Sequence, residues 1–250
     1  MKKIRQLTGL LLIAGFLMAY ITACEKTEVL LGALPSDGTI VDADGNVYNT
    51  VQIGNQVWTV ENLKTTKYNN GNSIPNLVKP IDWAYATKGA YCNYNNLESN
   101  ADIYGRLYNW HAVSTGKLAP SGWHVATDND WLILESYVGA NRYILDTTKL
   151  GTTIAKLLCA KTNWPYGYSN GAPGTYPQYN NGSGFSALPG GLRYSHGEFA
   201  EIERYGYWWT STQTNSDYAR HRYLLFCNSD LLRLPGHNKL CGFSVRLVKN

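Results

Sequence analysis

Residues 127–139, TDNDWLILESYVG, predict a helix in the middle of a chain whose other regular segments favour strands. Thr127 is a helix-capping residue type, and the aspartates that follow it place negative charge in the first turn, where the helix dipole favours it. Apolar side chains then recur with helical spacing at Trp131, Leu134, Tyr137 and Val138. Gly139 is expected to end this helix.

Outward from this helix, the chain changes to patterns typical of strands. A second helix is predicted from about Thr152 to Lys161, where apolar side chains share one face. Alternation and turn residues predict strands over residues 39–41, 47–53, 56–60, 185–194, 207–212, 223–226 and 242–248. Residues 68–100 predict long ordered loops, and residues 104–113 a compact aromatic segment that faces the core. The predicted order along the chain, strands followed by two helices and then by more strands, favours an α+β fold.

The turn between the first two strands carries three oxygen-bearing side chains, Asp42, Asp44 and Asn46, which imitate the start of a calcium loop. The acidic residue that should complete such a loop does not follow. We therefore predict turn chemistry here.

The N-terminus predicts the signal peptide of a bacterial lipoprotein over residues 1–23. Three basic residues precede an apolar run, residues 10–19, that is too short for a membrane-spanning helix. The run ends in Ile21-Thr22-Ala23-Cys24, which resembles a lipobox. We expect a lipid on Cys24, a tether over residues 24–38 and one domain over residues 39–250, anchored to the outer membrane and exposed at the cell surface. A periplasmic face is one alternative, and an ordinary secretory signal is another.

The charge of the chain argues against a nucleic-acid partner. Removing the three basic residues of the signal from the 22 in the chain leaves 19, against 18 acidic residues, and no basic cluster remains. The lipid is the only predicted contact with the membrane. Aromatic residues make up 13% of the chain and suit both a packed, loop-rich domain and a surface for polar ligands.

Four cysteines remain after Cys24, at Cys92, Cys159, Cys227 and Cys241, and four cysteines allow three connectivities. A bridge between Cys227 and Cys241 is one alternative, and unpaired thiols are the other. The sequence contains no cysteine–histidine pattern with metal-ligand spacing, and we assign no metal or other cofactor.

Several segments together resemble the Fibrobacter succinogenes major paralogous domain. They are residues 54–58, 61–63, 89–92, 104–110, 120–127, 184–191, 207–211 and 242–246. The resemblance covers nearly the whole mature chain in the family's order. It implies a C-type-lectin-like fold, with two helices, a small twisted antiparallel sheet and long ordered loops, distantly like the formylglycine-generating enzyme group. Fold alone does not give an activity.

Ligand binding or adhesion is the function that this resemblance favours. The sequence lacks the Glu-Pro-Asn or Gln-Pro-Asp motif of calcium-dependent lectins, and Trp209-Thr210-Ser211 lacks the carboxylate expected there. A formylglycine-generating activity would need two closely spaced cysteines near the C-terminus, whereas Cys227 and Cys241 are far apart. We therefore expect no enzyme activity. A structural envelope or fimbrial component is a further alternative.

A third hypothesis is that the C-terminal segment is a target of a diversity-generating retroelement. Such elements mutate adenines, and the resulting codons cannot encode Lys, Glu, Gln, Met or Trp. Residues 214–238 contain none of these five types, and the flanking segments fit the fixed frame of the family. A static, diverged loop is the alternative, and under diversification Cys227 and Cys241 need not pair.

Under either hypothesis, the binding surface is predicted within residues 218–238, with a protein or glycan outside the cell as partner. Arginine can form forked hydrogen bonds with acidic or polar ligands, and aromatic rings can stack. The predicted contacts are Tyr218, Arg220, His221, Arg222, Asn228, Asp230, Leu232, Arg233, His237 and Asn238. About half of the side chains in a strand-like segment should face the core.

Overall fold

The computed structural model describes residues 38–145 and 151–250. The predicted signal peptide, Cys24 and nearly all of the tether lie outside the described residues. No helix in the described ranges has the length and hydrophobicity needed to cross a membrane.

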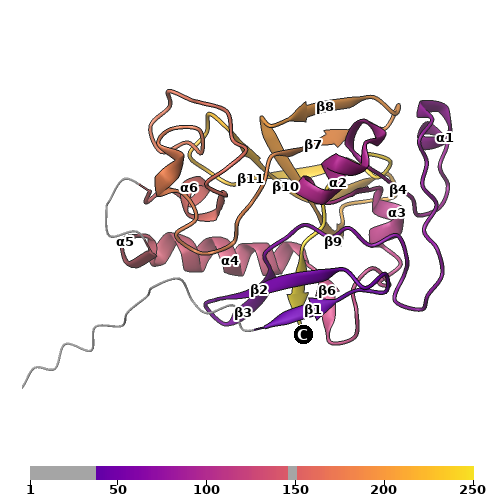
Figure 1. The fold of residues 1–250 in the computed structure, drawn as a ribbon, viewed down its shortest axis with the longest axis horizontal. Helices are drawn as coiled ribbons and strands as arrows, with labels where there is room; N and C mark the ends of the chain where they lie inside the picture. The colour runs from indigo at the N-terminus through magenta and orange to yellow at the C-terminus, as the bar shows by residue number, and fades with distance from the viewer. Residues whose placement is uncertain (1–37, 146–150) are drawn as a thin grey trace, which may run out of the picture. The chain divides into compact units, whose positions relative to one another are not determined.

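Two five-stranded sheets and a two-stranded pair form the framework (Figure 1). The first sheet has the order β1-β2-β3-β12-β6, and all its pairs are antiparallel. Its strands are β1 (Thr39–Val41), β2 (Val47–Ile53), β3 (Gln56–Thr59), β6 (Trp123–Val125) and β12 (Leu247–Lys249).

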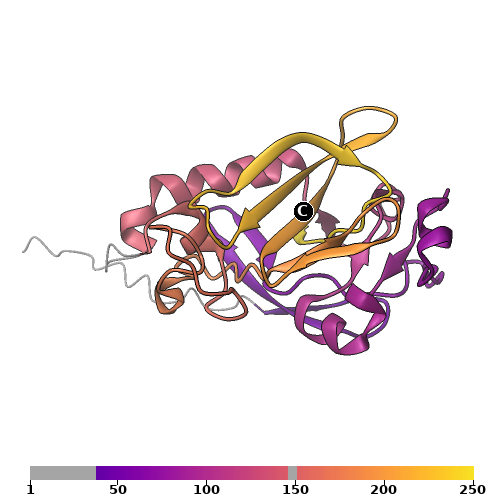
Figure 2. The same cartoon turned by 90° about the horizontal axis from the view of Figure 1, so that it is seen from above.

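The second sheet has the order β11-β10-β9-β7-β8, and β7 and β9 pair in parallel while its other neighbours are antiparallel. Its strands are β7 (Gly190–Arg193), β8 (Phe199–Ile202), β9 (Tyr205–Gln213), β10 (Tyr218–Leu225) and β11 (Leu232–Asn238). β4 (Tyr91–Cys92) and β5 (Leu107–Tyr108) form the separate pair. In Figure 2, the yellow hairpin of β10 and β11 lies at one edge of the second sheet.

The α+β prediction is confirmed, but the described residues contain more helices than the two expected. They are α1 (Pro80–Ala84), α2 (Glu98–Tyr104), α3 (Trp110–Val113), α4 (Asp128–Ala140), α5 (Arg142–Leu145) and α6 (Ile154–Leu158), with 3₁₀ turns η1 (Tyr94–Asn96) and η2 (Pro177–Tyr179). The prediction of a single small antiparallel sheet is wrong. The described residues form two five-stranded sheets, and β7 and β9 pair in parallel.

The long helix α4 begins where the sequence predicts. The Thr127 hydroxyl accepts a hydrogen bond from the backbone N–H of Asp130, and the Asp130 carboxylate accepts one from the backbone N–H of Thr127. This reciprocal pair satisfies amides that the first helical turn leaves free. The helix continues one residue past Gly139, and it packs against β2 of the first sheet and β9 of the second (Figure 1).

A core of large aromatic side chains lies around α4. Trp58 contacts Trp131 at a centroid distance of 5.1 Å, and Phe185 stands edge-on to Trp131 at 5.5 Å. Trp208 of β9 completes the contact at 6.1 Å from Trp131. All four rings are fully buried, so side chains from the first sheet, α4 and the second sheet form one hydrophobic core.

The C-terminal segment, residues 242–249, connects the parts of this framework. Single bridges join Gly242 to Arg193 of β7, Phe243 to Tyr108 of β5, and Ser244 to Trp208 of β9. β12 then pairs with β3 and β6 in the first sheet. Of the strand predicted over residues 242–248, only the part from Leu247 onward forms a regular strand. The residues before it make single bridges to three separate strands.

The aspartate-rich turn is held by protein donors, as turn chemistry predicts. The Asp42 carboxylate accepts hydrogen bonds from the backbone amides of Asp44 and Asn46 and from the Tyr48 hydroxyl. Asp44 accepts from Thr65 and the Thr66 amide, and its carboxylate pairs with Lys67 at 3.2 Å. These contacts occupy the carboxylates and tie the first hairpin to residues 65–67.

Candidate functional site

The predicted binding segment folds as the hairpin of β10 and β11, with its turn at residues 226–231. β11 is an edge strand, and its residues 233–235 are exposed. Pro235 suits this position, because proline cannot donate a hydrogen bond to a further strand. The predicted surface is therefore on a sheet edge, not on an irregular loop.

Successive side chains of β10 point to opposite sides of the sheet. Arg220, Arg222 and Leu224 point toward α4, whereas His221 and Tyr223 contact aromatic rings on the other side. A register shift between Ala219 and His221 marks a bulge in the pairing with both neighbouring strands. The two faces of this hairpin thus have different chemistry.

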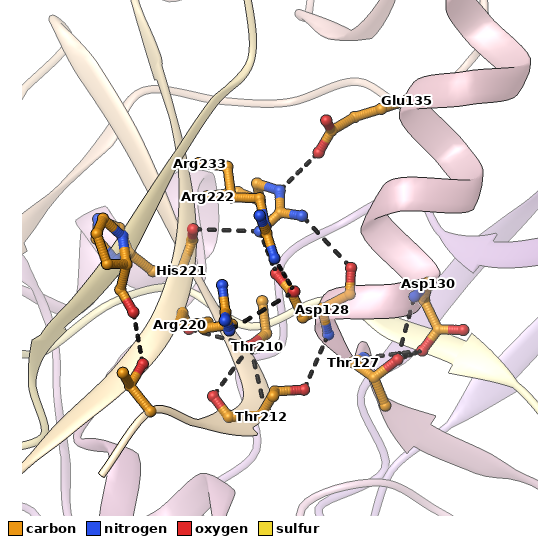
Figure 3. Close-up of polar contacts among 12 residues, drawn as sticks. Thr127, Asp128, Asp130, Glu135, Thr210, Thr212, Arg220, His221, Arg222 and Arg233 are labelled. Carbon is orange, nitrogen blue, oxygen red and sulfur yellow. Dashed lines mark hydrogen bonds and ion pairs between the residues drawn. The ribbon is translucent and has the colours of Figure 1, made fainter.

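Arg222 was predicted as a ligand contact, and the structure corrects this. Its side chain is fully buried, and its Nη1 donates to Asp128 Oδ1 at 2.7 Å. Its Nε donates to Glu135 Oε1 at 2.6 Å (Figure 3). Arg222 therefore ties the hairpin to α4, because losing one partner of a buried ion pair costs several kcal/mol of stability, about 3–5 kcal/mol.

Asp128, the first residue of α4, gathers three arginines from the hairpin (Figure 3). In addition to Arg222, Arg233 donates to it through Nη2 at 2.7 Å and through Nε at 3.1 Å. Arg220 lies farther away, with Nε 3.7 Å from Oδ2. One carboxylate thereby fixes the positions of both hairpin strands relative to the helix.

Asp128 is ionised over the whole physiological range. Its partial burial raises its pKa, but hydrogen bonds from Arg233 and Arg222 outweigh burial and lower the pKa to about 2. The backbone N–H of Asp128 also donates to the Thr212 hydroxyl of β9 at 3.1 Å. The helix start is thus joined to all three strands at this edge of the sheet.

His221 was also predicted as a ligand contact, and the structure corrects this too. The side chain is fully buried and packs near the rings of Tyr223, His237 and Phe243. Burial, followed by the neighbouring His237 and Arg222, lowers its pKa to about 3, so the ring is neutral at physiological pH. Among the described residues, neither ring nitrogen has a hydrogen-bond partner.

On the same side of the sheet, partly exposed rings form an aromatic face made of Tyr205, Tyr207, Tyr223 and His237. Tyr205 and Tyr207 stack at 5.7 Å with an interplanar angle of 6°, and Tyr207 stacks on Tyr223 at 5.6 Å and 15°. Phe243 lies beneath Tyr207 at 5.1 Å and contacts His237 at 5.2 Å. The core therefore fixes the rings of this face in position.

The other predicted contacts differ in exposure. Tyr218, Asp230 and Arg233 are exposed, whereas Arg220, Asn228, Leu232, His237 and Asn238 are partly buried. The Asn228 side-chain oxygen accepts from the backbone N–H of Asp230, and that of Asn238 accepts from Leu240. These asparagines hold turns at the two ends of β11.

The alternative of a Cys227–Cys241 bridge is not realised, and all four cysteines of the described residues are free thiols. The pairing of Tyr218 with Asn238 and of Tyr223 with Leu232 places the two cysteines at opposite ends of the hairpin. The seven residue steps of β10 span roughly 23 Å, which is far beyond the reach of a disulfide. Cys227 is exposed and Cys241 is buried.

Sequence analysis missed Tyr205 and Tyr207 as surface residues and Asp128 as the partner of the arginines. The alternation of Tyr205, Tyr207 and Trp209 could have indicated the aromatic face, because residues two apart share a side of a strand. Nothing local marks Asp128, which lies 94 positions before Arg222 in the chain. An acidic residue at the start of a helix is already favoured by the helix dipole, so Asp128 gives no hint of a distant arginine partner.

Two histidine–carboxylate pairs occur outside the hairpin. The ring of His124 lies between Asp130 at 3.0 Å and Asn250 at 2.7 Å, so both of its nitrogens serve the start of α4 and the C-terminus. His196 and Glu198 form an exposed pair at 3.2 Å. In the part of the chain that the structure describes, no group of three or more histidine, cysteine or acidic side chains is arranged to hold a metal ion.

Comparison with known proteins gives a family but no individual relative. The model of the Fibrobacter succinogenes major domain matches residues 51–249, which include the whole second sheet and the first sheet from the middle of β2 onward. Neither the curated proteins nor the solved structures gave a match. Because this match covers most of the chain, the protein belongs to the Fibrobacter succinogenes major domain family.

Proposed function

We propose that this chain is an exported lipoprotein that binds a ligand outside the cell through the aromatic face of its second sheet. In this proposal Cys24 carries the lipid, and the domain that follows the tether presents the face at the cell surface. A C-type-lectin-like fold is part of the same proposal. It rests on the resemblance of the sequence motifs, and the mixed α/β framework with long ordered connections is compatible with it.

The observation that carries the proposal is the stack of Tyr205, Tyr207 and Tyr223 on a rigid support. Each ring is partly exposed, yet the stacking contacts hold the three rings nearly parallel. Tyrosines arranged in this way present apolar faces and hydroxyl groups and lose little conformational entropy on binding. Arg233 is not part of this face, because it pairs with Asp128 on the α4 side of the sheet.

The structure also indicates why the support is rigid. Asp128 and Glu135 fix the opposite side of β10 through the buried Arg222, and Phe243 backs the rings from below. A surface that is ordered before binding gains affinity because little freedom is lost when the ligand arrives. The face can therefore discriminate among ligands by shape.

The test is a binding measurement with the full-length chain in detergent micelles against immobilised glycans and envelope proteins. For each ligand retained, we expect Tyr223→Ala and Tyr205→Ala to weaken binding by about tenfold or more, which corresponds to about 1.4 kcal/mol. Tyr85→Ala is the matched control, because Tyr85 is 77% exposed, follows α1 and is not a residue of the aromatic face. Unchanged affinity in both face variants would overturn the proposal, as would the absence of any retained ligand.

A further inference from the structure

A second group of tyrosines is more exposed than the aromatic face and lies on a different part of the chain. Tyr166 is 72% exposed, Tyr168 is 86% exposed and Tyr176 is 61% exposed. We call these three residues the tyrosine surface. They lie in the loops that follow α6, among the pink and orange segments around α6 in Figure 1.

The sequence around these tyrosines has an unusual composition. No Asp, Glu, Lys, Arg or His occurs from residue 162 to residue 192, and no Leu, Ile, Val or Met occurs from residue 162 to residue 187. The exposed side chains near these tyrosines are small or amide-bearing, including Ser169, Asn170 and Gln178. The surface thus offers rings, hydroxyls and amides, without charges or aliphatic side chains.

A buried lysine holds the loops in place. Lys156 of α6 is 1% exposed, and its ammonium donates to the carbonyls of Thr175 and Tyr176 and to Asn180 Oδ1, the last at 2.9 Å. The Asn180 amide donates in turn to the carbonyls of Ala160 and Pro173. The backbone beneath Tyr176 is therefore anchored from inside the domain.

The two loop segments that carry the tyrosines are also joined to each other by hydrogen bonds. The backbone N–H of Gly167 donates to Gly174 at 3.0 Å, and the Thr175 hydroxyl donates to the carbonyls of Gly167 and Ser169 at 2.9 Å and 2.8 Å. These bonds bring Tyr166 and Tyr168 beside the segment that carries Tyr176. The rings of Tyr166 and Tyr168 stand perpendicular, with centroids 4.9 Å apart and an interplanar angle of 86°.

Four non-glycine residues of this region have positive φ angles, at Asn163, Tyr176, Asn181 and Ser186. The φ of Tyr176 is 51°, a conformation that a bulky side chain adopts only where the surroundings impose it. Such conformations gather at sites where the position of a side chain serves a function. Here the residue in this conformation carries an exposed ring, which contacts the ring of Tyr179 at a centroid distance of 6.4 Å.

We propose that the tyrosine surface binds a neutral polysaccharide. The C–H faces of sugar rings can pack on exposed aromatic rings, and sugar hydroxyls can exchange hydrogen bonds with tyrosine hydroxyls and with amides such as Asn170 and Gln178. The lack of charge over residues 162–192 removes the groups that would select an acidic polymer. Protein interfaces are enriched in arginine and methionine as well as in tyrosine, and residues 162–192 contain neither arginine nor methionine.

This inference goes beyond the proposed function, because the tyrosine surface and the aromatic face are separate groups of residues. The loops do contact the turn of the hairpin, since the backbone N–H of Gly174 donates to the carbonyl of Phe226 and that of Ala155 to Ser229. The two surfaces are therefore neighbours on one rigid support. Each can be removed without altering the side chains of the other.

The experiment is affinity electrophoresis of the full-length chain in detergent, in gels that contain soluble neutral β-glucan, xylan, mannan or starch. We expect at least one of these polymers to retard the protein. Retardation should be unchanged between about 50 mM and about 500 mM NaCl, because no ion pair contributes to it. Polygalacturonate, an acidic polymer, serves as the comparison and should not retard the protein.

The decisive variant is Tyr166→Ala combined with Tyr168→Ala, which should weaken retardation by about tenfold or more in apparent Kd. Tyr168→Trp keeps an aromatic ring and should keep retardation, and Tyr85→Ala should behave as the unaltered chain. Thermal unfolding of each variant verifies that the domain is folded, and a variant that does not fold is replaced by Tyr168→Ser alone.

Three outcomes would overturn this inference. They are the absence of retardation by every neutral polymer, equal retardation of the double variant and the unaltered chain, and salt-sensitive binding to polygalacturonate alone. Tyr223→Ala separates this inference from the proposed function, because it removes a ring of the aromatic face and leaves the tyrosine surface intact. Loss of retardation in Tyr223→Ala with full retention in the double variant would assign the polysaccharide to the aromatic face and refute the tyrosine surface.

Discussion

His221 lies inside the second sheet, where burial keeps its ring uncharged. Its pKa is lowered to about 3, below the value of 6.5 for an unperturbed histidine. Between these two values the unfolded chain binds a proton at this side chain and the folded chain does not. Stability is therefore lost as the pH falls below about 6.5, and the loss continues toward the folded pKa.

We predict that His221→Phe makes the protein less sensitive to mild acid. A phenyl ring suits an environment of Tyr223, His237 and Phe243, and it cannot be protonated. When the pH falls from 7 to 5, the unaltered chain should lose about 2 kcal/mol more of its free energy of unfolding than the variant does. Urea unfolding at both pH values measures this difference. His196→Phe, at an exposed histidine, is the control, and parallel pH curves for His221→Phe and the unaltered chain would contradict the prediction.

At the residue level, the sequence predicted the strand-like course of residues 218–238 better than which of its side chains face outward. Tyr218 and Arg233 are exposed as expected, whereas His221 and Arg222 are buried. Alternation along a strand could have separated Arg222 from Tyr223, but it could not say which of the two faces the core. That choice depends on Asp128 and Glu135, which folding brings from α4.

At the scale of elements, the position of the β10–β11 hairpin against α4 depends on one carboxylate. Asp128→Asn would remove the charge that Arg222 and Arg233 share and leave Glu135 alone with the buried Arg222. We expect the free energy of unfolding to fall by about 3 kcal/mol at pH 7, as is usual when a buried ion pair loses one partner. Asp230→Asn, in the exposed turn of the same hairpin, should change it by less than about 0.5 kcal/mol.

The same carboxylate makes a stability contribution that depends on pH. Because the folded pKa of Asp128 is about 2, against an ordinary value of 3.8, its contribution is present above about pH 4 and is lost as the pH falls toward 2. The loss amounts to roughly 2 kcal/mol in the unaltered chain and should be missing in Asp128→Asn. Acid titration followed by circular dichroism measures both, and an identical acid midpoint in the two proteins would refute the assigned role.

Local signals predicted α4 correctly because its start is fixed by neighbours in sequence, Thr127 and Asp130. The second predicted helix was too long for the opposite reason. α6 ends at Leu158, since Cys159 adopts an extended conformation and bridges to Ala187, so that a distant segment ends the helix. The helices α1 and α2 were missed because their 5 and 7 residues are too few to show a helical apolar period.

The paired glycines before Arg193 illustrate a feature that sequence could mark but not explain. The strand predicted over residues 185–194 is observed only as β7, in which Gly191 has a φ of 66°. A Cβ at this position would lie 2.6 Å from the carbonyl oxygen of Ala200 in β8. The sequence indicated a need for glycine, whereas the close approach of β8 that creates the need is a tertiary contact.

At the scale of the whole molecule, we predict that Cys24 decides where the protein resides. Cys24→Ala should abolish incorporation of radiolabelled palmitate and move the protein from the membrane fraction to the soluble fraction, because the lipid is the proposed anchor. Cys227→Ala, at an exposed cysteine of the domain, should leave labelling unchanged. Labelling that persists in Cys24→Ala would exclude this anchor.

The arrangement of the C-terminal segment has a consequence for how the protein is made. Residues 242–249 bridge β5, β7 and β9 and then pair with both β3 and β6, and they follow all of these strands in the chain. A nascent chain that lacks them cannot close the contacts between its early and late halves, because every one of these pairings is long-range. We therefore expect the domain to complete its fold only after residues 242–249 have been synthesised, which suits the proposed export of the chain.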